Sequence, residues 1–280
     1  MKTSMFVLLA LAVSLLVADL PAAEHKPPFE LTAEQQAEVD RVLAQWEQAD
    51  AKVKTFECRF VRWRHDLVFD GPNKENRCKA CGVLKYEAPD KGVLRVLEME
   101  KDGQMVEADA VNAEHYVCHE KSVYLHEYVA KRLSEFQLPH DSRGKFLSEG
   151  PIPFPVATTA RNMKKHYHIR VVEPPEDVKD QIWLEAYPRD SRAAYLFSRV
   201  EFILDSRNMR VTAIQFSSSD GKTRMAYSLY DIKVNAPDSL TDILGPKPFV
   251  VETPPGWKKT IFSEHGIVEE EDTPADDESR

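Results

Sequence analysis

Residues 55–60 read Thr-Phe-Glu-Cys-Arg-Phe, and from this stretch onward the sequence follows the periodicity of β-strands. Apolar side chains alternate with charged ones, the pattern of a strand with one buried face. Similar short segments recur to residue 235, and turn signals such as Asp102-Gly103 and Asp220-Gly221 separate several of them. The further segments are 84–87, 94–97, 100–107, 115–119, 123–128, 168–173, 181–187, 197–204, 209–217 and 224–235. We therefore expect about ten antiparallel strands.

Helical periodicity precedes this run and interrupts it once. Thr32 is followed by Glu34, Gln35 and Gln36, as in a capped helix start. Apolar residues then repeat at helical spacing over about 20 residues, at Val39, Val42, Leu43 and Trp46. Mid-chain, 158–166 reads as a second helix, and 131–136 reads as half a helix.

These elements predict one α+β domain, because no repeat and no Gly/Ser-rich linker divides the chain. An antiparallel sheet either covers each face or exposes it to water. Amphipathic helices before and within the strand run offer such a cover, so we expect a curved sheet wrapped around them.

The two ends of the chain differ from this body. Residues 1–23 have a charged start, an apolar centre and small residues at the exit, as in a secretory signal peptide. The apolar run is shorter than the roughly 20 residues of a membrane span, and no cysteine follows it for lipid attachment. We expect an exported protein, periplasmic or extracellular, soluble and without a transmembrane anchor.

Most of the negative charge lies at the C-terminus. The net charge is −9, and residues 264–280 hold eight acidic residues against one arginine, or −7. The signal segment is neutral, so the body carries about −2 and shows no nucleic-acid-binding pattern. Residues 263–280 are expected to form a disordered acidic tail.

The four cysteines could form structural disulfides, a metal site or a redox pair. In an oxidising compartment, Cys58, Cys78, Cys81 and Cys118 are disulfide candidates with three alternative pairings. Zinc ligation by Cys78, Cys81, His115 and Cys118 is the less favoured alternative. A redox Cys-x-x-Cys motif belongs at a helix start in a βαβ unit, which is absent here. We favour disulfides and expect no metal.

Signatures of catalysis are missing. The sequence has no Gly-x-Ser-x-Gly elbow and no His-Glu-x-x-His, and its ten glycines form no phosphate-binding loop. We expect no enzyme activity and no cofactor. The basic and aromatic run 62–65 reads as an exposed strand end.

Several strings, in their order along the chain, resemble the LolA/LolB superfamily of periplasmic lipoprotein carriers and receptors, in particular an uncharacterised exported branch. The resemblance covers roughly residues 35–262. The strings are 55–60, the Gly-x-Leu strand with a terminal proline at 82–89, the proline-containing 150–154, the hairpin 205–216 and the closing segment 249–256.

This resemblance implies an incomplete antiparallel β-barrel, with helices covering a hydrophobic concave face that receives acyl chains. The domain would span residues 24–262. LolA carriers have an arginine before the strand-ending proline, whereas this chain has Ala88, so we do not expect lid gating of that kind. In the strands with the clearest alternation, the apolar residues that should point to the concave face suggest six cavity residues. These are Phe56, Phe60, Leu84, Tyr86, Ile214 and Phe216.

The leading functional hypothesis is a carrier that binds a lipoprotein acyl moiety or another amphiphile in this cavity. The alternative is a protein-interaction module of the cell envelope, with the same fold and a filled core, that binds a protein partner through an edge strand or the acidic tail. A Cys/His zinc-binding domain is the third hypothesis.

Overall fold

Most of the regular structure belongs to one β-sheet. The computed structural model describes residues 26–68, 78–119, 121–150, 154–237, 244–245, 247–263 and 266–272. The strands are β1 (Thr55–Asp66), β2 (Cys78–Glu87), β3 (Lys91–Lys101), β4 (Gln104–Glu107), β5 (His115–His119), β6 (Ser122–Glu127), β7 (Arg132–Gln137), β8 (Tyr167–Val172), β9 (Gln181–Pro188), β10 (Phe197–Asp205), β11 (Arg210–Ser218), β12 (Thr223–Val234), β13 (Lys258–Ser263) and β14 (Gly266–Asp272).

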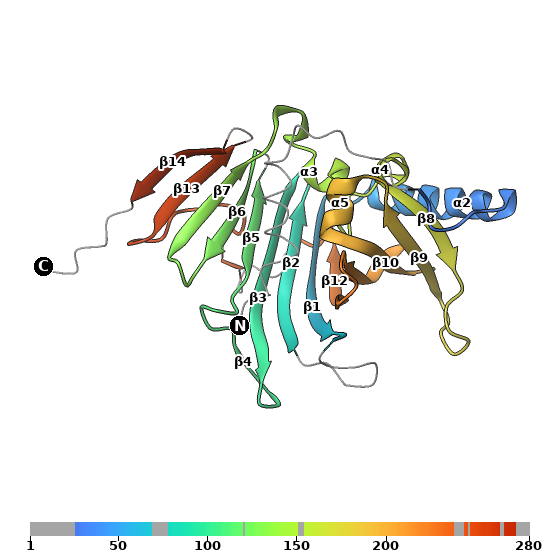
Figure 1. The fold of residues 1–280 in the computed structure, drawn as a ribbon, viewed down its shortest axis with the longest axis horizontal. Helices are drawn as coiled ribbons and strands as arrows, with labels where there is room; N and C mark the ends of the chain where they lie inside the picture. The colour runs from blue at the N-terminus through green and yellow to red at the C-terminus, as the bar shows by residue number, and fades with distance from the viewer. Residues whose placement is uncertain are drawn as a thin grey trace, which may run out of the picture.

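The sheet is curved and does not close. Its order is β14-β13-β7-β6-β5-β3-β2-β1-β12-β11-β10-β9-β8, with β4 paired to β3 (Figure 1). Neighbours are antiparallel except β7 and β13, which are parallel. Within the described residues, β8 and β14 are the two ends of this order and do not pair with each other. The expected α+β fold, an incomplete antiparallel barrel, is confirmed, with 14 described strands in place of about ten.

Two expectations about particular segments are wrong. Residues 131–136 do not form half a helix: from Arg132 on they belong to β7. A six-residue helix is marginal by itself, whereas this strand pairs with β6 and β13 and buries Leu133 and Phe136. The tail does not begin at residue 263. β14 pairs with β13 and sets Glu271 and Asp272 opposite Lys259 and Lys258, so strand pairing orders part of the acidic run. Residues 1–25 and 273–280 lie outside the described residues.

The first helix supplies much of the core. Helix α2 (Ala33–Asp50) begins with a capping box, in which Thr32 and Gln35 each accept a hydrogen bond from the other's backbone amide. Its apolar face packs on the concave face of the sheet, where the rings of Trp46 and Phe202 meet edge to face at 5.3 Å. Among the described helices, none is long and apolar enough to cross a membrane.

Shorter helices complete the described part of the fold. They are α3 (Phe146–Glu149), α4 (Ala160–His166) and α5 (Ser191–Leu196), and a 3-10 turn spans His140–Ser142. Helix α4 matches the expected mid-chain helix, and the Thr159 side chain caps it by accepting a hydrogen bond from the Asn162 amide. Helix α4 contacts α2 and β8.

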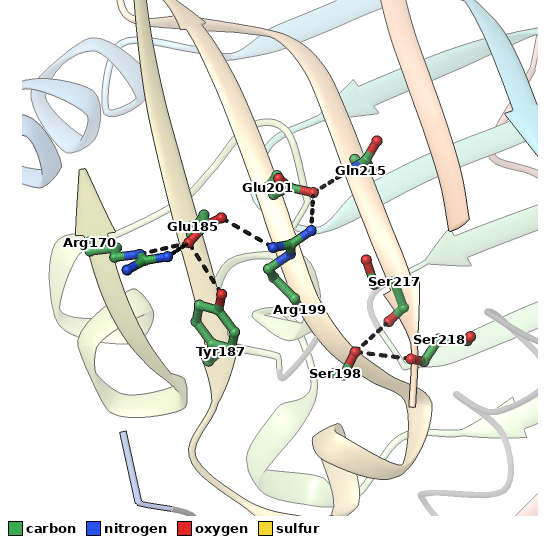
Figure 2. Close-up of polar contacts among 9 residues, drawn as sticks. All are labelled: Arg170, Glu185, Tyr187, Ser198, Arg199, Glu201, Gln215, Ser217 and Ser218. Carbon is green, nitrogen blue, oxygen red and sulfur yellow. Dashed lines mark hydrogen bonds and ion pairs between the residues drawn. The ribbon is translucent and has the colours of Figure 1, made fainter. Parts of the chain in front are cut away.

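A ladder of polar and charged side chains ties β8, β9, β10 and β11 together on the outer face, with Gln215 of β11 bonded to Glu201 (Figure 2). Glu185 and Glu201 lie directly opposite each other on β9 and β10. Arg199 reaches both carboxylates, at 3.2 and 3.3 Å, and Arg170 pairs with Glu185 from β8. Like charges opposite each other destabilise a sheet, so Arg199 converts a repulsive pair into an attractive triad.

The variant Arg199→Met leaves the two glutamates opposed. We expect the free energy of unfolding in urea to fall by about 1 kcal/mol, with most of the loss disappearing in 1 M salt. Adding Glu201→Gln to Arg199→Met removes the repulsion and restores stability. Arg207→Met, at an exposed turn pair with Asp205, is the control and changes little. An equal loss in both arginine variants would contradict this account of Arg199.

Candidate functional site

An apolar cavity of about 130 Å³ lies between the concave face of the sheet and the segment around α3. Strands on both sides of β1 contribute to its wall, and α3 and the residues before α4 form its cover. The lining residues are Phe60, Leu84, Gly92, Val93, Leu94, Tyr116, Cys118, Val123, Phe146, Leu147, Phe154, Pro155, Ile214, Phe216, Tyr227 and Leu229. Most of these side chains are aliphatic or aromatic, so the cavity is suited to an apolar group.

Two glycines shape the wall. A Cβ atom at Gly82 would lie 2.4 Å from Cζ of Phe60, so the Phe60 ring rests directly on the backbone of β2. A Cβ atom at Gly92 would lie 2.9 Å from a methyl group of Leu147. Glycine at these strand positions allows close approach from the facing side chains. Leu147 of the cover therefore packs directly against the backbone of β3.

One buried carboxylate fixes the cover to the sheet. Asp90 lies in the β2–β3 turn, fully buried, and accepts hydrogen bonds from the backbone amides of Phe146 at 2.9 Å and Leu147 at 2.6 Å. These are the first residues of α3, whose amides have no partner within the helix. The Tyr86 hydroxyl donates to the Pro89 carbonyl at 3.1 Å and supports the same turn. Asp90 thus holds two lining residues in place.

A second buried carboxylate fixes the other end of the cover. Asp50, the last residue of α2, accepts a hydrogen bond from the Thr158 amide at 3.2 Å and pairs with Arg210 at 3.0 Å. Burial raises the pKa of Asp50 to about 6, against the opposing effect of the Thr158 amide and of Arg210. Asp50 therefore joins α2, the cover and β11.

The structure places four of the six expected cavity residues in the lining: Phe60, Leu84, Ile214 and Phe216. Phe56 and Tyr86 point to the same face but are packed in the core outside the lining. Continuing the same inward phase along β5 and β12 would have found Tyr116, Cys118, Tyr227 and Leu229. The cover residues carry no periodic signal, and residues 151–153 of the proline-containing string lie outside the described residues.

The expected disulfide among the described thiols is not formed. Cys58, Cys81 and Cys118 are free, and the side chain of Cys78 lies outside the described residues. Cys58 and Cys118 share the concave face, but β2 and β3 separate their strands, which puts them roughly 14 Å apart at about 4.8 Å per strand. Cys81 is adjacent to the inward Gly82 and lies on the outer face. A disulfide needs Cα atoms within about 7 Å, so these three cannot pair.

The alternative zinc set is not assembled either. Cys81 and Cys118 lie on opposite faces of the sheet, and the ring of His115 stacks on that of His126 at 4.2 Å. Burial, with His126 and Arg95 nearby, lowers the pKa of His115 to about 3. Among the described residues, no three potential ligands gather around one point.

Comparisons with known proteins find distant structural likenesses. No family model matches the chain, and no curated protein matches it. An uncharacterized conserved protein from Thermus thermophilus is 11% identical, with a TM-score of 0.42 over 82% of this chain and 99% of that one. A LolA superfamily protein from Nitrosomonas europaea is 12% identical, with a TM-score of 0.33 over 79% and 100%. A chain of the Pseudomonas aeruginosa MucA/MucB complex is 14% identical, with a TM-score of 0.39 over 81% of this chain and 71% of that one.

The raised pKa of Asp50 predicts a stability that falls with rising pH. Between its ordinary value of 3.8 and about 6, the unfolded chain has an ionised Asp50 while the folded chain still holds the proton. The free energy of unfolding therefore decreases through this window, by up to about 1.4 kcal/mol per pH unit from this group. Asp50→Asn removes this pH-dependent contribution. The difference in the free energy of unfolding in urea between wild type and variant, measured at several pH values from 4 to 6, should therefore fall as the pH rises.

Asp40 on the same helix is the matched control. Lys164 lies 2.6 Å away and lowers the pKa of Asp40, which is nearly unburied. Asp40→Asn should therefore give a pH-dependent difference of the opposite sign, confined to more acidic pH. An Asp50→Asn curve parallel to wild type between pH 4 and 6 would show that Asp50 titrates normally.

Proposed function

We propose that this protein is an exported carrier-like protein that binds the acyl part of a lipoprotein, or another amphiphile, in the cavity of its half-barrel. The cavity itself is the observation that supports this proposal. Phe60 and Leu84 from the sheet face Leu147 and Phe154 from the cover across a space that protein atoms leave unfilled. Cores normally pack with few voids larger than a water molecule, so a space of this size invites an apolar ligand.

The volume bounds what the cavity holds. An engineered apolar cavity of about 150 Å³ binds benzene, so about 130 Å³ fits one ring or a short length of acyl chain. Burying roughly six methylenes contributes about 5 kcal/mol, which corresponds to affinities between millimolar and micromolar. A longer ligand must therefore extend beyond the cavity or displace part of the cover.

The polar atoms of the lining favour binding over catalysis. Three side chains offer a thiol or hydroxyl: Cys118, Tyr116 and Tyr227. Burial raises the pKa of all three, so they stay protonated and non-nucleophilic at neutral pH. The proposal therefore assigns the cavity a ligand and no reaction.

Export is part of the same proposal. It is supported by the signal-like composition of residues 1–23. A carrier of this topology could move between membranes with its apolar cargo shielded from water.

Partly filling the cavity should weaken binding. Val123→Phe adds a ring to the cavity wall, and we expect it to weaken binding of the neutral fluorescent probe N-phenyl-1-naphthylamine, whose phenyl ring fits the cavity while the rest extends beyond it, at least tenfold. Val129→Phe, at an exposed turn next to the same strand, introduces the same residue outside the cavity and should bind like wild type. Ile214→Phe fills the cavity from the opposite wall and replaces Val123→Phe if that variant misfolds.

Native mass spectrometry of the purified full chain supplies the second measurement, with a co-purifying amphiphile as the expected result. If wild type binds no probe and no amphiphile co-purifies, the carrier proposal is overturned in favour of a filled-core interaction module. Probe binding that both cavity variants leave unchanged would place the ligand elsewhere.

A further inference from the structure

A buried ion pair lies behind Tyr227 at one end of the cavity, and the proposed function does not use it. Arg62 of β1 and Glu114, just before β5, form a two-pronged contact, with Nη1–Oε2 at 2.7 Å and Nη2–Oε1 at 2.9 Å. Their side chains are 8% and 12% exposed. The sequence pattern suggested that 62–65 is an exposed strand end, and for Arg62 that expectation is wrong.

The pair shares the concave face with the cavity lining. Arg62 lies two residues beyond Phe60, and Glu114 two residues before Tyr116, so strand alternation points both side chains inward. Tyr227 is the register partner of Arg62 on β12 and also lines the cavity. Its ring centre lies 6.0 Å from the guanidinium carbon. Tyr227 thus separates the ion pair from the cavity by one side chain.

Small residues explain how the pair spans the sheet. Strands β2 and β3 lie between β1 and β5, and the residue opposite Arg62 on β2 is Ala80, with Gly82 next along the inward face. No bulky side chain of β2 rises between the two charged groups at these two positions, so they meet across the curved face. Burial alone lowers the pKa of Arg62, but Tyr227 and Glu114 more than offset this, so Arg62 is a permanent cation.

Glu114 therefore sets the net charge at this end of the cavity to zero. A ligand carboxylate placed beside Tyr227 would leave the buried site at −1, because Glu114 already neutralises Arg62. An uncharged ester, amide or alcohol could accept a hydrogen bond from the Tyr227 hydroxyl without adding a charge. Charges interact strongly where water is excluded, so this difference is large enough to select ligands.

We propose that the cavity selects amphiphiles with an uncharged polar group over the corresponding carboxylates, and that Glu114 is the residue that determines this specificity. The inference rests on the proposed function, because it names the ligand class of the same cavity. Without Glu114, the unpaired Arg62 would attract the carboxylate and reverse the selection.

The test compares methyl octanoate, octanoate and octylamine as competitors of N-phenyl-1-naphthylamine at pH 7.5, using the full chain. Wild type should bind methyl octanoate at least tenfold more tightly than octanoate. In Glu114→Gln, the ratio of the two affinities should shift toward octanoate by at least tenfold. Arg62→Gln, which leaves Glu114 unpaired, should shift binding the opposite way, toward octylamine.

Asp205→Asn is the control. Asp205 forms a two-pronged pair with Arg207 at the turn between β10 and β11, and neither residue lines the cavity. This variant should leave every affinity ratio as in wild type. Melting curves establish that each variant is folded, and the wild-type comparison needs no variant at all.

The outcomes separate the two proposals. Binding of neither octanoyl compound nor the probe to wild type overturns the proposed function itself. If wild type binds both compounds, two results would overturn the specificity inference and leave the proposed function standing. One is that octanoate binds wild type as tightly as its methyl ester does. The other is that the folded Glu114→Gln and Arg62→Gln variants keep the wild-type affinity ratios.

Discussion

The concave face of one continuous curved sheet must be kept from water, and most features of this protein follow from that constraint. Helix α2 covers the part near β8 and β10, where Trp46 packs on Phe202. Truncating a buried tryptophan of this kind typically costs 3–5 kcal/mol, roughly half of the stability of a small domain. The part near β5 and β6 is covered by the four-residue α3. The cavity lies where these unequal covers leave the concave face incompletely filled.

Buried ionic groups hold this arrangement together across long distances in sequence. Asp90 binds the start of α3, Asp50 joins α2 to β11 and Glu114 joins β5 to Arg62 on β1. Each carboxylate has partners for its oxygens, as buried polar groups require. Removing one partner of such a group leaves an uncompensated charge, which costs more than the pair itself contributes. These three positions therefore constrain where the covers and strands can sit.

Sequence periodicity predicted the strand run, helix α2 and four of the lining residues, because each of these depends on alternation within a single segment. It failed where pairing with other strands decides. β7 is a strand because β6 and β13 flank it, and β14 is ordered by its backbone pairing with β13. The disulfide expectation counted cysteines without knowing their strands. The burial of Arg62 depends on Glu114, 52 residues away, which no local pattern reveals.

A charge at the end of an apolar cavity poses a problem for any protein that must exist both empty and filled. An unpaired arginine there would be an uncompensated buried charge in the empty state, at a cost of several kcal/mol. A ligand that neutralised it would be hard to release. Because Arg62 is already paired with Glu114, the site is neutral in both states, and the difference between them reduces mainly to burial of the apolar group. That difference is a few kcal/mol for a cavity of this size, which would suit the reversible loading and release that the proposed function requires.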